Sequence, residues 1–294
     1  MTALPDWNHG LSMAQLTTIR GLALMPLYDW PEYHGDTDAL WDRIRAAGRD
    51  QGLDLPPGLE HRNHSISAWM DDGLVFSQLC GSPWYRHHRA RARYLASSVL
   101  AVQGAPAGQY FSHVIVRDGS GLSTLDDIEQ AGDARFAFNE PDSQSGVHCL
   151  RARFDMDAQL ARGLHSGGHR HSIDAVLAGD ADFAAIDACS FRLYAGLFPA
   201  RLDGLRIVAQ TPLRPAPVLI TSATLDGDTA ERLQRSVLTA LAGGLVDGLA
   251  AGGGGQQDHA GSHAFVGAAN LGAEAYRVFE GDARAMPARS TPQA

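Results

Sequence analysis

Residues 166–187 read SGGHRHSIDAVLAGDADFAAID, and this stretch decides how we expect the chain to fold. Ile173, Val176 and Leu177 recur at helical spacing, and Gly179 stands where a glycine commonly ends a helix. The run DFAAI follows almost at once and is short and apolar, as buried strands are. A helix that leads directly into a buried strand is typical of α/β folds, and this strand would bring Asp187 to one edge of a sheet.

Strand-like and helix-like runs alternate along the rest of the chain, without an internal repeat. A buried strand over Ile19–Leu27 would end at Tyr28 and Asp29. Further strands are expected over Gly73–Leu79, His113–Arg117, Arg135–Phe138, Leu205–Ala209 and Val218–Thr221. Helices are expected over Asp36–Ala47 and Thr124–Gln130, after Gly146 (from the spacing of Val147, Leu150 and Phe154), and over Thr229–Leu241. The sequence therefore predicts an α/β protein, with a flexible loop at Gly252–Gly255 and a disordered tail over residues 286–294.

The net charge and the basic residues exclude several classes of function. A net charge of −9 argues against nucleic acid or an anionic membrane as a general partner. The locally basic run YRHHRARARY over Tyr85–Tyr94 is short, and we interpret it as a solvated helix face. The chain contains no lysine, which excludes a P-loop lysine and a Schiff-base lysine.

The N-terminal residues and the cysteines indicate the compartment. The N-terminus has no basic segment followed by an apolar run, and no segment has about 20 uninterrupted apolar residues. Cys80, Cys149 and Cys189 are far apart and odd in number, so we expect free thiols. We therefore expect a cytoplasmic protein with no membrane insertion, or a periplasmic one if the true start or the processing differs.

The segment FNEPDSQSG (Phe138–Gly146) follows a predicted strand. It contains three uncharged polar residues in succession, Ser143, Gln144 and Ser145. The first amides of a helix lack intrahelical partners and carry the positive end of the helix dipole. Ser143 and Ser145 would add hydroxyl donors there, and Gly146 would let a ligand approach the backbone, which makes an oxyanion site plausible. The alternative is that either serine merely caps a helix.

Three histidines, His165, His169 and His171, fall within seven residues. One interpretation is a metal site, although Asp174 is the only nearby carboxylate at helical spacing. The other is that His169 begins the helix, points into a cleft and donates a hydrogen bond to an anion. Asp187, at the carboxyl end of a strand, stands where open α/β folds place ligand contacts, or it caps the next segment.

The order of these segments resembles the substrate-binding proteins of phosphate, phosphite and phosphonate ABC transporters. The resemblance rests on SGGHRHSIDAVLAGDADFAAID and on FNEPDSQSG, which is similar to that family's serine- and threonine-rich anion loop. Weaker matches are MPLYD (Met25–Asp29), FSQLCGSPW (Phe76–Trp84) and YFSHVIVR (Tyr110–Arg117). The GxSxG signature of hydrolases is absent, and no Ser/His/Asp triad can be assembled from neighbouring residues.

The resemblance implies the two-lobed type II periplasmic-binding-protein fold, with the ligand in the cleft between lobes. Lobe one would comprise residues 1–110 and 214–294, and lobe two residues 111–213. The implied ligand-binding residues are Tyr28, Ser143, Gln144, Ser145, Gly146, His169 and Asp187. Gln144 stands where the family usually has a second hydroxyl residue, so we expect the ligand to differ from a simple phosphonate.

The implied function is the binding of a small oxyanion such as phosphonate or phosphate, without catalysis and without a cofactor. The partners would be that anion and an ABC-transporter permease, and we expect a monomer. One alternative is a lyase-type enzyme on the same fold, with His169 or Asp187 as general base. Others are a cytoplasmic ligand sensor and a metal-binding protein that uses His165, His169 and His171.

Overall fold

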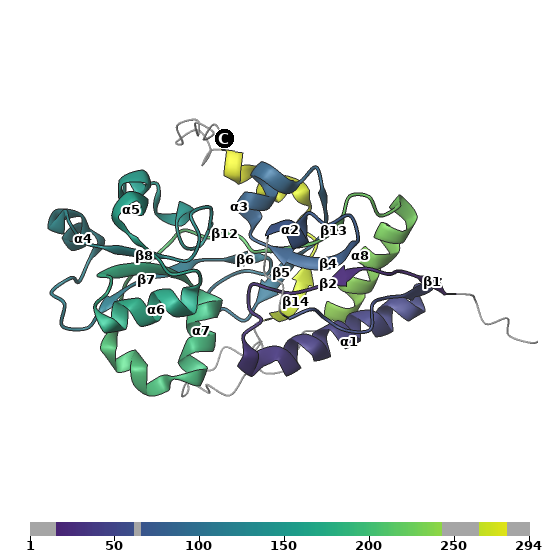
Figure 1. Ribbon diagram of the computed structural model, residues 1–294, viewed down its shortest axis with the longest axis horizontal. Coiled ribbons are helices and arrows are strands. Elements are labelled where there is room, and N and C mark those ends of the chain that lie inside the picture. Colours follow the sequence, from purple (N-terminus) through teal and green to yellow (C-terminus); the bar gives the residue numbers. More distant parts are fainter. Residues whose placement is uncertain (1–15, 62–65, 243–264, 281–294) are drawn as a thin grey trace, which may run out of the picture.

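The computed structural model describes residues 16–61, 66–242 and 265–280 and consists of two α/β lobes, each built on a five-stranded sheet (Figure 1). The loop predicted at Gly252–Gly255 and the tail predicted over residues 286–294 lie outside these residues. Within them, no helix combines the length and the apolar character that crossing a membrane requires.

Lobe one is built on a mixed sheet with the strand order β14-β5-β13-β4-β2. Its strands are β2 (Leu22–Ala23), β4 (Leu74–Leu79), β5 (Ala92–Leu100), β13 (Val218–Ser222) and β14 (Phe265–Ala269). Only β2 and β4 are parallel; the other neighbouring pairs are antiparallel. The helices α1 (His34–Asp50) and α8 (Gly227–Leu241) pack against each other, and α2 (Ile66–Trp69) and α3 (Gly81–Pro83) are short. A two-stranded ladder of β1 (Thr17–Thr18) and β3 (Leu53–Asp54) lies beside them.

Lobe two has the strand order β11-β7-β10-β8-β9. Its strands are β7 (Ser112–Arg117), β8 (Phe136–Phe138), β9 (Leu164–His165), β10 (Phe183–Asp187) and β11 (Leu205–Gln210). Its helices are α4 (Leu125–Ala131), α5 (Met156–Arg162), α6 (His169–Ala178) and α7 (Ala188–Leu197). The helix and strand predicted around Gly179 are thus confirmed as α6 and β10, and Gly179 ends α6 with φ of +79°.

The central strand of lobe two, β10, is apolar from Phe183 to Ile186 because both faces of the sheet are buried. Phe183 and Ala185 of β10 belong to one core cluster, together with Phe136 of β8. Ala184 and Ile186 belong to a second cluster, on the opposite face. Successive side chains of a strand point to opposite faces, so two buried faces require an unbroken apolar run.

Two short strands, β6 (Gln109–Tyr110) and β12 (Arg214–Pro215), pair antiparallel where the chain passes between the two sheets (Figure 1). The chain leaves the strands of lobe one after β5 and returns to them at β13. The division into residues 1–110 plus 214–294 and residues 111–213 stays a prediction.

Three local predictions are wrong. The strand expected over Ile19–Leu27 is reduced to β2. The helix expected after Gly146 is only a 3₁₀ turn over His148–Leu150, and the next helix, α5, is capped separately by the side chain of Asp155. The run Tyr85–Tyr94 contains a π-helical turn over Trp84–His88 and then enters β5, so it presents no continuous helix face.

Candidate ligand-binding site

The loop that follows β8 folds into a tight, buried turn. Ser143, Gln144 and Ser145 are 3%, 1% and 4% exposed. The Gly146 amide donates to Oγ of Ser143 at 3.0 Å, so this serine does act as a local cap. A Cβ atom on residue 146 would lie 1.8 Å from Oδ1 of Asn139, so the turn as built requires a glycine.

The Gln144 side chain is the unusual member of this loop. Neither its amide nitrogen nor its amide oxygen has a hydrogen-bond partner in the part of the chain that the structure describes. Burying an amide without partners is costly, and native proteins contain few such groups. This residue therefore calls for a partner that the polypeptide itself does not supply.

Ser145 joins the loop to two residues brought from elsewhere in lobe two. Its Oγ lies 2.9 Å from Nε2 of His169, the first residue of α6. The same Nε2 lies 3.3 Å from Oδ2 of Asp187, the last residue of β10. The structure thus brings the anion loop, the predicted histidine and the predicted carboxylate together.

Tyr28 reaches this group from lobe one. Its hydroxyl donates to Oδ1 of Asp187 at 3.2 Å, and the same oxygen accepts the Ser190 amide at 2.9 Å. Asp187 therefore caps α7 and also contacts the other lobe, whereas its contact with a ligand stays a prediction. Tyr28 and Asp187 are each 2% exposed.

Further contacts hold the two lobes together beside this group. Oη of Tyr33 donates to the carbonyl of Leu193 at 3.0 Å. Arg170, the neighbour of His169, donates to both carboxylate oxygens of Glu32 at 3.0 Å. The site is therefore shut off from solvent, and its polar groups interact in a low-dielectric surrounding.

Burial sets the protonation of the group. It lowers the pKa of His169, an effect that the Asp187 carboxylate and the Ala185 carbonyl partly oppose. Burial, reinforced by the charge of Asp187, raises the pKa of Tyr28 well above its usual value. Burial also raises the pKa of Cys80 to about 12, with smaller contributions from Asp187 and Asp142. At neutral pH the site thus holds a neutral tyrosine and a neutral thiol.

Ser145, His169 and Asp187 do not form a catalytic relay, although they are the residue types of one. In a Ser-His-Asp triad the carboxylate contacts Nδ1 of the imidazole and the serine contacts Nε2. Here both the serine oxygen and the carboxylate approach Nε2. The carboxylate therefore cannot orient the ring for proton transfer from the serine.

Other residues near the group were not predicted from the sequence. Oγ of Ser112, in β7, donates to the Ser145 carbonyl at 2.9 Å, and the Cys149 thiol reaches the same oxygen. Tyr110, in β6, is 2% exposed, and its pKa is raised by burial, by Cys80 and by Asp187. Two of these residues, Tyr110 and Ser112, lie in YFSHVIVR (Tyr110–Arg117). The polar side chains at the start of this strand were the signal from which they could have been predicted.

The segment FSQLCGSPW (Phe76–Trp84) runs from β4 into α3. Ser82 is fully buried, and its Oγ has no hydrogen-bond partner among the described residues. Gly81 packs so tightly that a Cβ atom there would lie 2.7 Å from the ring of Tyr276. FSQLCGSPW thus joins the end of β4 to a packed turn, and its polar side chains Ser77, Gln78 and Ser82 are all buried.

The three clustered histidines face different partners. Nε2 of His165 lies 3.3 Å from Glu140, and Nδ1 of His171 lies 3.1 Å from the Ser166 carbonyl. His169 faces Ser145 and Asp187 instead. The structure therefore does not bring His165, His169 and His171 together as ligands of one ion.

Comparisons with known proteins agree with this geometry. The family model described as "ABC transporter, phosphonate, periplasmic substrate-binding protein" matches residues 76–248, more than half of the chain. No curated protein sequence matches the chain.

Among solved structures, the chain is similar to a binding protein component of an ABC phosphonate transporter from Pseudomonas aeruginosa. The identity is 16%, the TM-score is 0.59, and 74% of each chain is covered. PhnD1 from Prochlorococcus marinus in complex with methylphosphonate is similar at 15% identity and a TM-score of 0.61, covering 90% of this chain and 97% of that one.

A third similar structure is XAC2383 from Xanthomonas citri bound to ATP, at 16% identity and a TM-score of 0.61, covering 90% of this chain and 96% of that one. At such identities these likenesses establish the fold, so the type II periplasmic-binding-protein fold is confirmed. Because the family model matches more than half of the chain, the chain belongs to the family of phosphonate ABC-transporter substrate-binding proteins.

Proposed function

We propose that the protein binds a small phosphonate-like oxyanion between its lobes and delivers it to an ABC-transporter permease without changing it chemically. The observation that carries the proposal is the meeting of Ser145, His169 and Asp187 from lobe two with Tyr28 from lobe one. Hydroxyl and imidazole groups are donors that suit phosphonate oxygens. Their burial strengthens each hydrogen bond to a charged ligand.

The number of donors is sufficient for useful affinity. A hydrogen bond to a charged group contributes roughly 1.5–3 kcal/mol. About four of them, less the cost of ordering the ligand and the side chains, reach the roughly 8 kcal/mol of micromolar binding. Binding therefore needs no covalent step and no metal.

Gln144 supports a ligand that is more than a methylphosphonate. Its amide can donate and accept at once, and neither its nitrogen nor its oxygen has a partner among the residues that the structure describes. A phosphonate with a protonated oxygen or a polar substituent would offer both an acceptor and a donor to this amide. Asp187 would then face the ligand's protonated or cationic end.

Two observations favour binding over catalysis. The serine and the carboxylate compete for one imidazole nitrogen, so His169 is not arranged as a relay base. Burial raises the pKa of Cys80 and of Cys189, and a thiol is a weak nucleophile in that state.

The proposal is tested by a thermal-shift screen of phosphate, phosphite, alkylphosphonates, aminoalkylphosphonates, sulfonates and carboxylates, followed by calorimetry on each hit. Ser145→Asp places a negative charge in the anion loop and should abolish binding. Ser120→Asp is the matched control. Ser112, at the start of β7, pairs with Asp187 of the site, whereas residue 120 follows the other end of that strand. Undiminished binding by Ser145→Asp would show that the anion lies elsewhere.

The absence of catalysis needs its own measurement. Each ligand found is incubated with the protein, and its phosphorus NMR spectrum is followed over days. We expect an unchanged spectrum. New resonances that disappear in a His169→Gln variant would instead establish the lyase-type alternative.

A further inference from the structure

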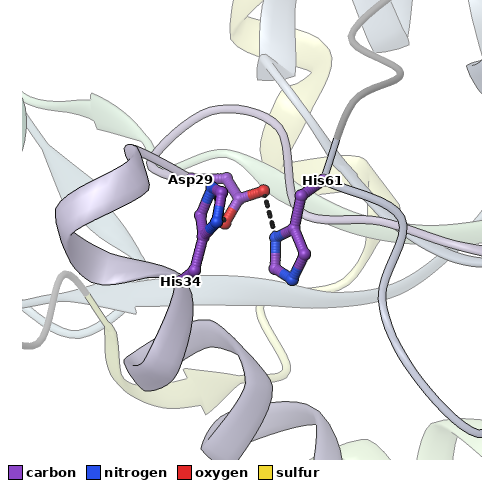
Figure 2. A group of neighbouring side chains, drawn as sticks. All are labelled: Asp29, His34 and His61. Atoms are coloured by element: carbon purple, nitrogen blue, oxygen red, sulfur yellow. Dashed lines mark hydrogen bonds and ion pairs between the residues drawn. The ribbon is translucent and has the colours of Figure 1, made fainter.

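A second group of titratable side chains lies on lobe one, outside the anion site. It consists of Asp29, His34 and His61 (Figure 2). Asp29 directly follows Tyr28, His34 is the first residue of α1, and His61 comes from the segment after β3. The Asp29 side chain is 1% exposed, whereas those of His34 and His61 are 35% and 21% exposed.

The two imidazoles approach the carboxylate from neighbouring directions. Nδ1 of His61 lies 2.7 Å from Oδ2 of Asp29, and Nε2 of His34 lies 3.7 Å from Oδ1. The two rings are stacked with their centroids 4.1 Å apart (Figure 2). One atom from each residue can be chosen so that all three lie within 4.8 Å of one another.

These separations are close to those around a bound metal ion. Zinc holds imidazole nitrogen and carboxylate oxygen at roughly 2.0–2.2 Å in tetrahedral geometry, which places the ligand atoms about 3.4 Å apart. Small movements of the two partly exposed histidines would therefore be enough to enclose an ion, while the buried carboxylate stays in place.

Two further residues, Thr37 and Asp38, form hydrogen bonds to the candidate metal ligands Asp29 and His61. Oγ1 of Thr37 donates to Oδ1 of Asp29 at 2.9 Å. Oδ1 of Asp38 lies 3.1 Å from Nε2 of His61, the nitrogen that does not face Asp29. A carboxylate on the far nitrogen of a histidine fixes the ring and leaves the near nitrogen free to bind a metal, an arrangement typical of zinc sites.

We propose that Asp29, His34 and His61 bind one Zn²⁺ ion, with water as the fourth ligand. Two imidazoles and one carboxylate suit zinc and neighbouring transition metals, whereas Ca²⁺ and Mg²⁺ prefer oxygen ligands alone. The competing interpretation is that His61 is a protonated imidazole that donates one hydrogen bond to Asp29 and one to Asp38. The two readings make opposite predictions about metal binding.

The test uses the full chain without an affinity tag, stripped with a chelator and titrated with Zn²⁺ against a chromophoric competitor. Mass spectrometry of the metal content after dialysis gives the stoichiometry. We expect one tight equivalent of Zn²⁺. His34→Ala should weaken it by more than the about 10–100-fold that loss of an outer-shell partner costs, and Asp38→Asn should weaken it by about 10–100-fold.

His171→Ala is the matched control, because His171 is exposed and faces the Ser166 carbonyl instead; it should leave the tight equivalent unchanged. Circular dichroism shows whether each variant is folded. If a variant is not folded, Asp29→Asn takes its place, because asparagine keeps the shape of the aspartate side chain. The proposal would be overturned if the wild type bound no tight equivalent of Zn²⁺, or if that equivalent survived His34→Ala and Asp29→Asn. Either result would favour a protonated His61 between Asp29 and Asp38. Neither result depends on which anion the cleft binds.

Discussion

The hydroxyl of Tyr28 donates to a carboxylate oxygen of Asp187 across the two lobes, although the residues are 159 positions apart in the chain. Tyr28→Phe removes one of the donors to this buried carboxylate. We expect a loss of about 1.5–3 kcal/mol in the free energy of unfolding, because hydrogen bonds to buried charged groups contribute that much. Chemical denaturation measures it.

Tyr85→Phe is the control for that change. The Tyr85 hydroxyl also donates to a carboxylate, Oε1 of Glu280, at 2.6 Å, but the Glu280 side chain is half exposed. Its loss should therefore destabilise the protein much less than the loss of the Tyr28 hydroxyl, because solvent screens the exposed carboxylate. Equal losses of unfolding free energy in the two variants would mean that the Tyr28–Asp187 contact stabilises the fold no more than an exposed hydrogen bond does.

Gln144→Met should stabilise the ligand-free protein and weaken ligand binding. Methionine keeps the length of the side chain and removes two buried amide atoms that have no partner within residues 16–61, 66–242 and 265–280. An unsatisfied buried polar group costs about 1–3 kcal/mol, so the free energy of unfolding should rise by an amount in this range. Denaturation and calorimetry on the same preparation separate the two effects.

Gln159→Met is its counterpart, because Gln159 is also buried and its amide oxygen also lacks a partner, but it lies on α5. We expect a gain in stability there with unchanged affinity. If Gln144→Met destabilised the free protein, the amide would have a structural role instead.

Gly146→Ala should destabilise the protein by about 1–3 kcal/mol, the usual cost of forcing atoms into a filled space. The added methyl group would collide with the Asn139 amide and crowd Oγ of Ser143. Gly227→Ala, where a Cβ meets no atom within 4 Å, should be nearly neutral. The thermal midpoints of the two variants can be compared directly.

His169 makes the stability depend on pH in a defined direction. Its pKa in the folded protein is lowered below 6.5, so between that lowered value and 6.5 the unfolded chain binds more protons. The free energy of unfolding should therefore fall as the pH is lowered from about 7.5 to about 5.5. His169→Gln should lose less stability over this interval, because it lacks the titrating ring. Equal slopes in urea denaturation series would contradict the assignment.

The arrangement of lobe two could be predicted because its elements follow simple periodicities. Buried strands such as β10 are continuous apolar runs, and α6 begins and ends at recognisable residues. The helix predicted after Gly146 was wrong for a physical reason. Val147, Leu150 and Phe154 are all buried in one core cluster, and an irregular segment produced the same spacing as a helix.

The grouping of Asp29, His34 and His61 could not be predicted. It depends on the segment after β3, which brings His61 back to the start of α1. The spacing of apolar residues in the sequence does not indicate where such a segment leads. That the Gln144 amide has no hydrogen-bond partner among the described residues is equally a property of the packed fold, and its role in anion binding stays a prediction.

The contacts between the two lobes bear on how fast a ligand could be exchanged. Tyr28 with Asp187, Tyr33 with Leu193, and Glu32 with Arg170 must all separate before a molecule bound between the lobes can leave. The residence time of such a ligand would then follow the lifetime of these contacts rather than the strength of its own bonds alone. A substitution that removes one of these contacts between the lobes would then shorten the residence time of every ligand, whatever its affinity.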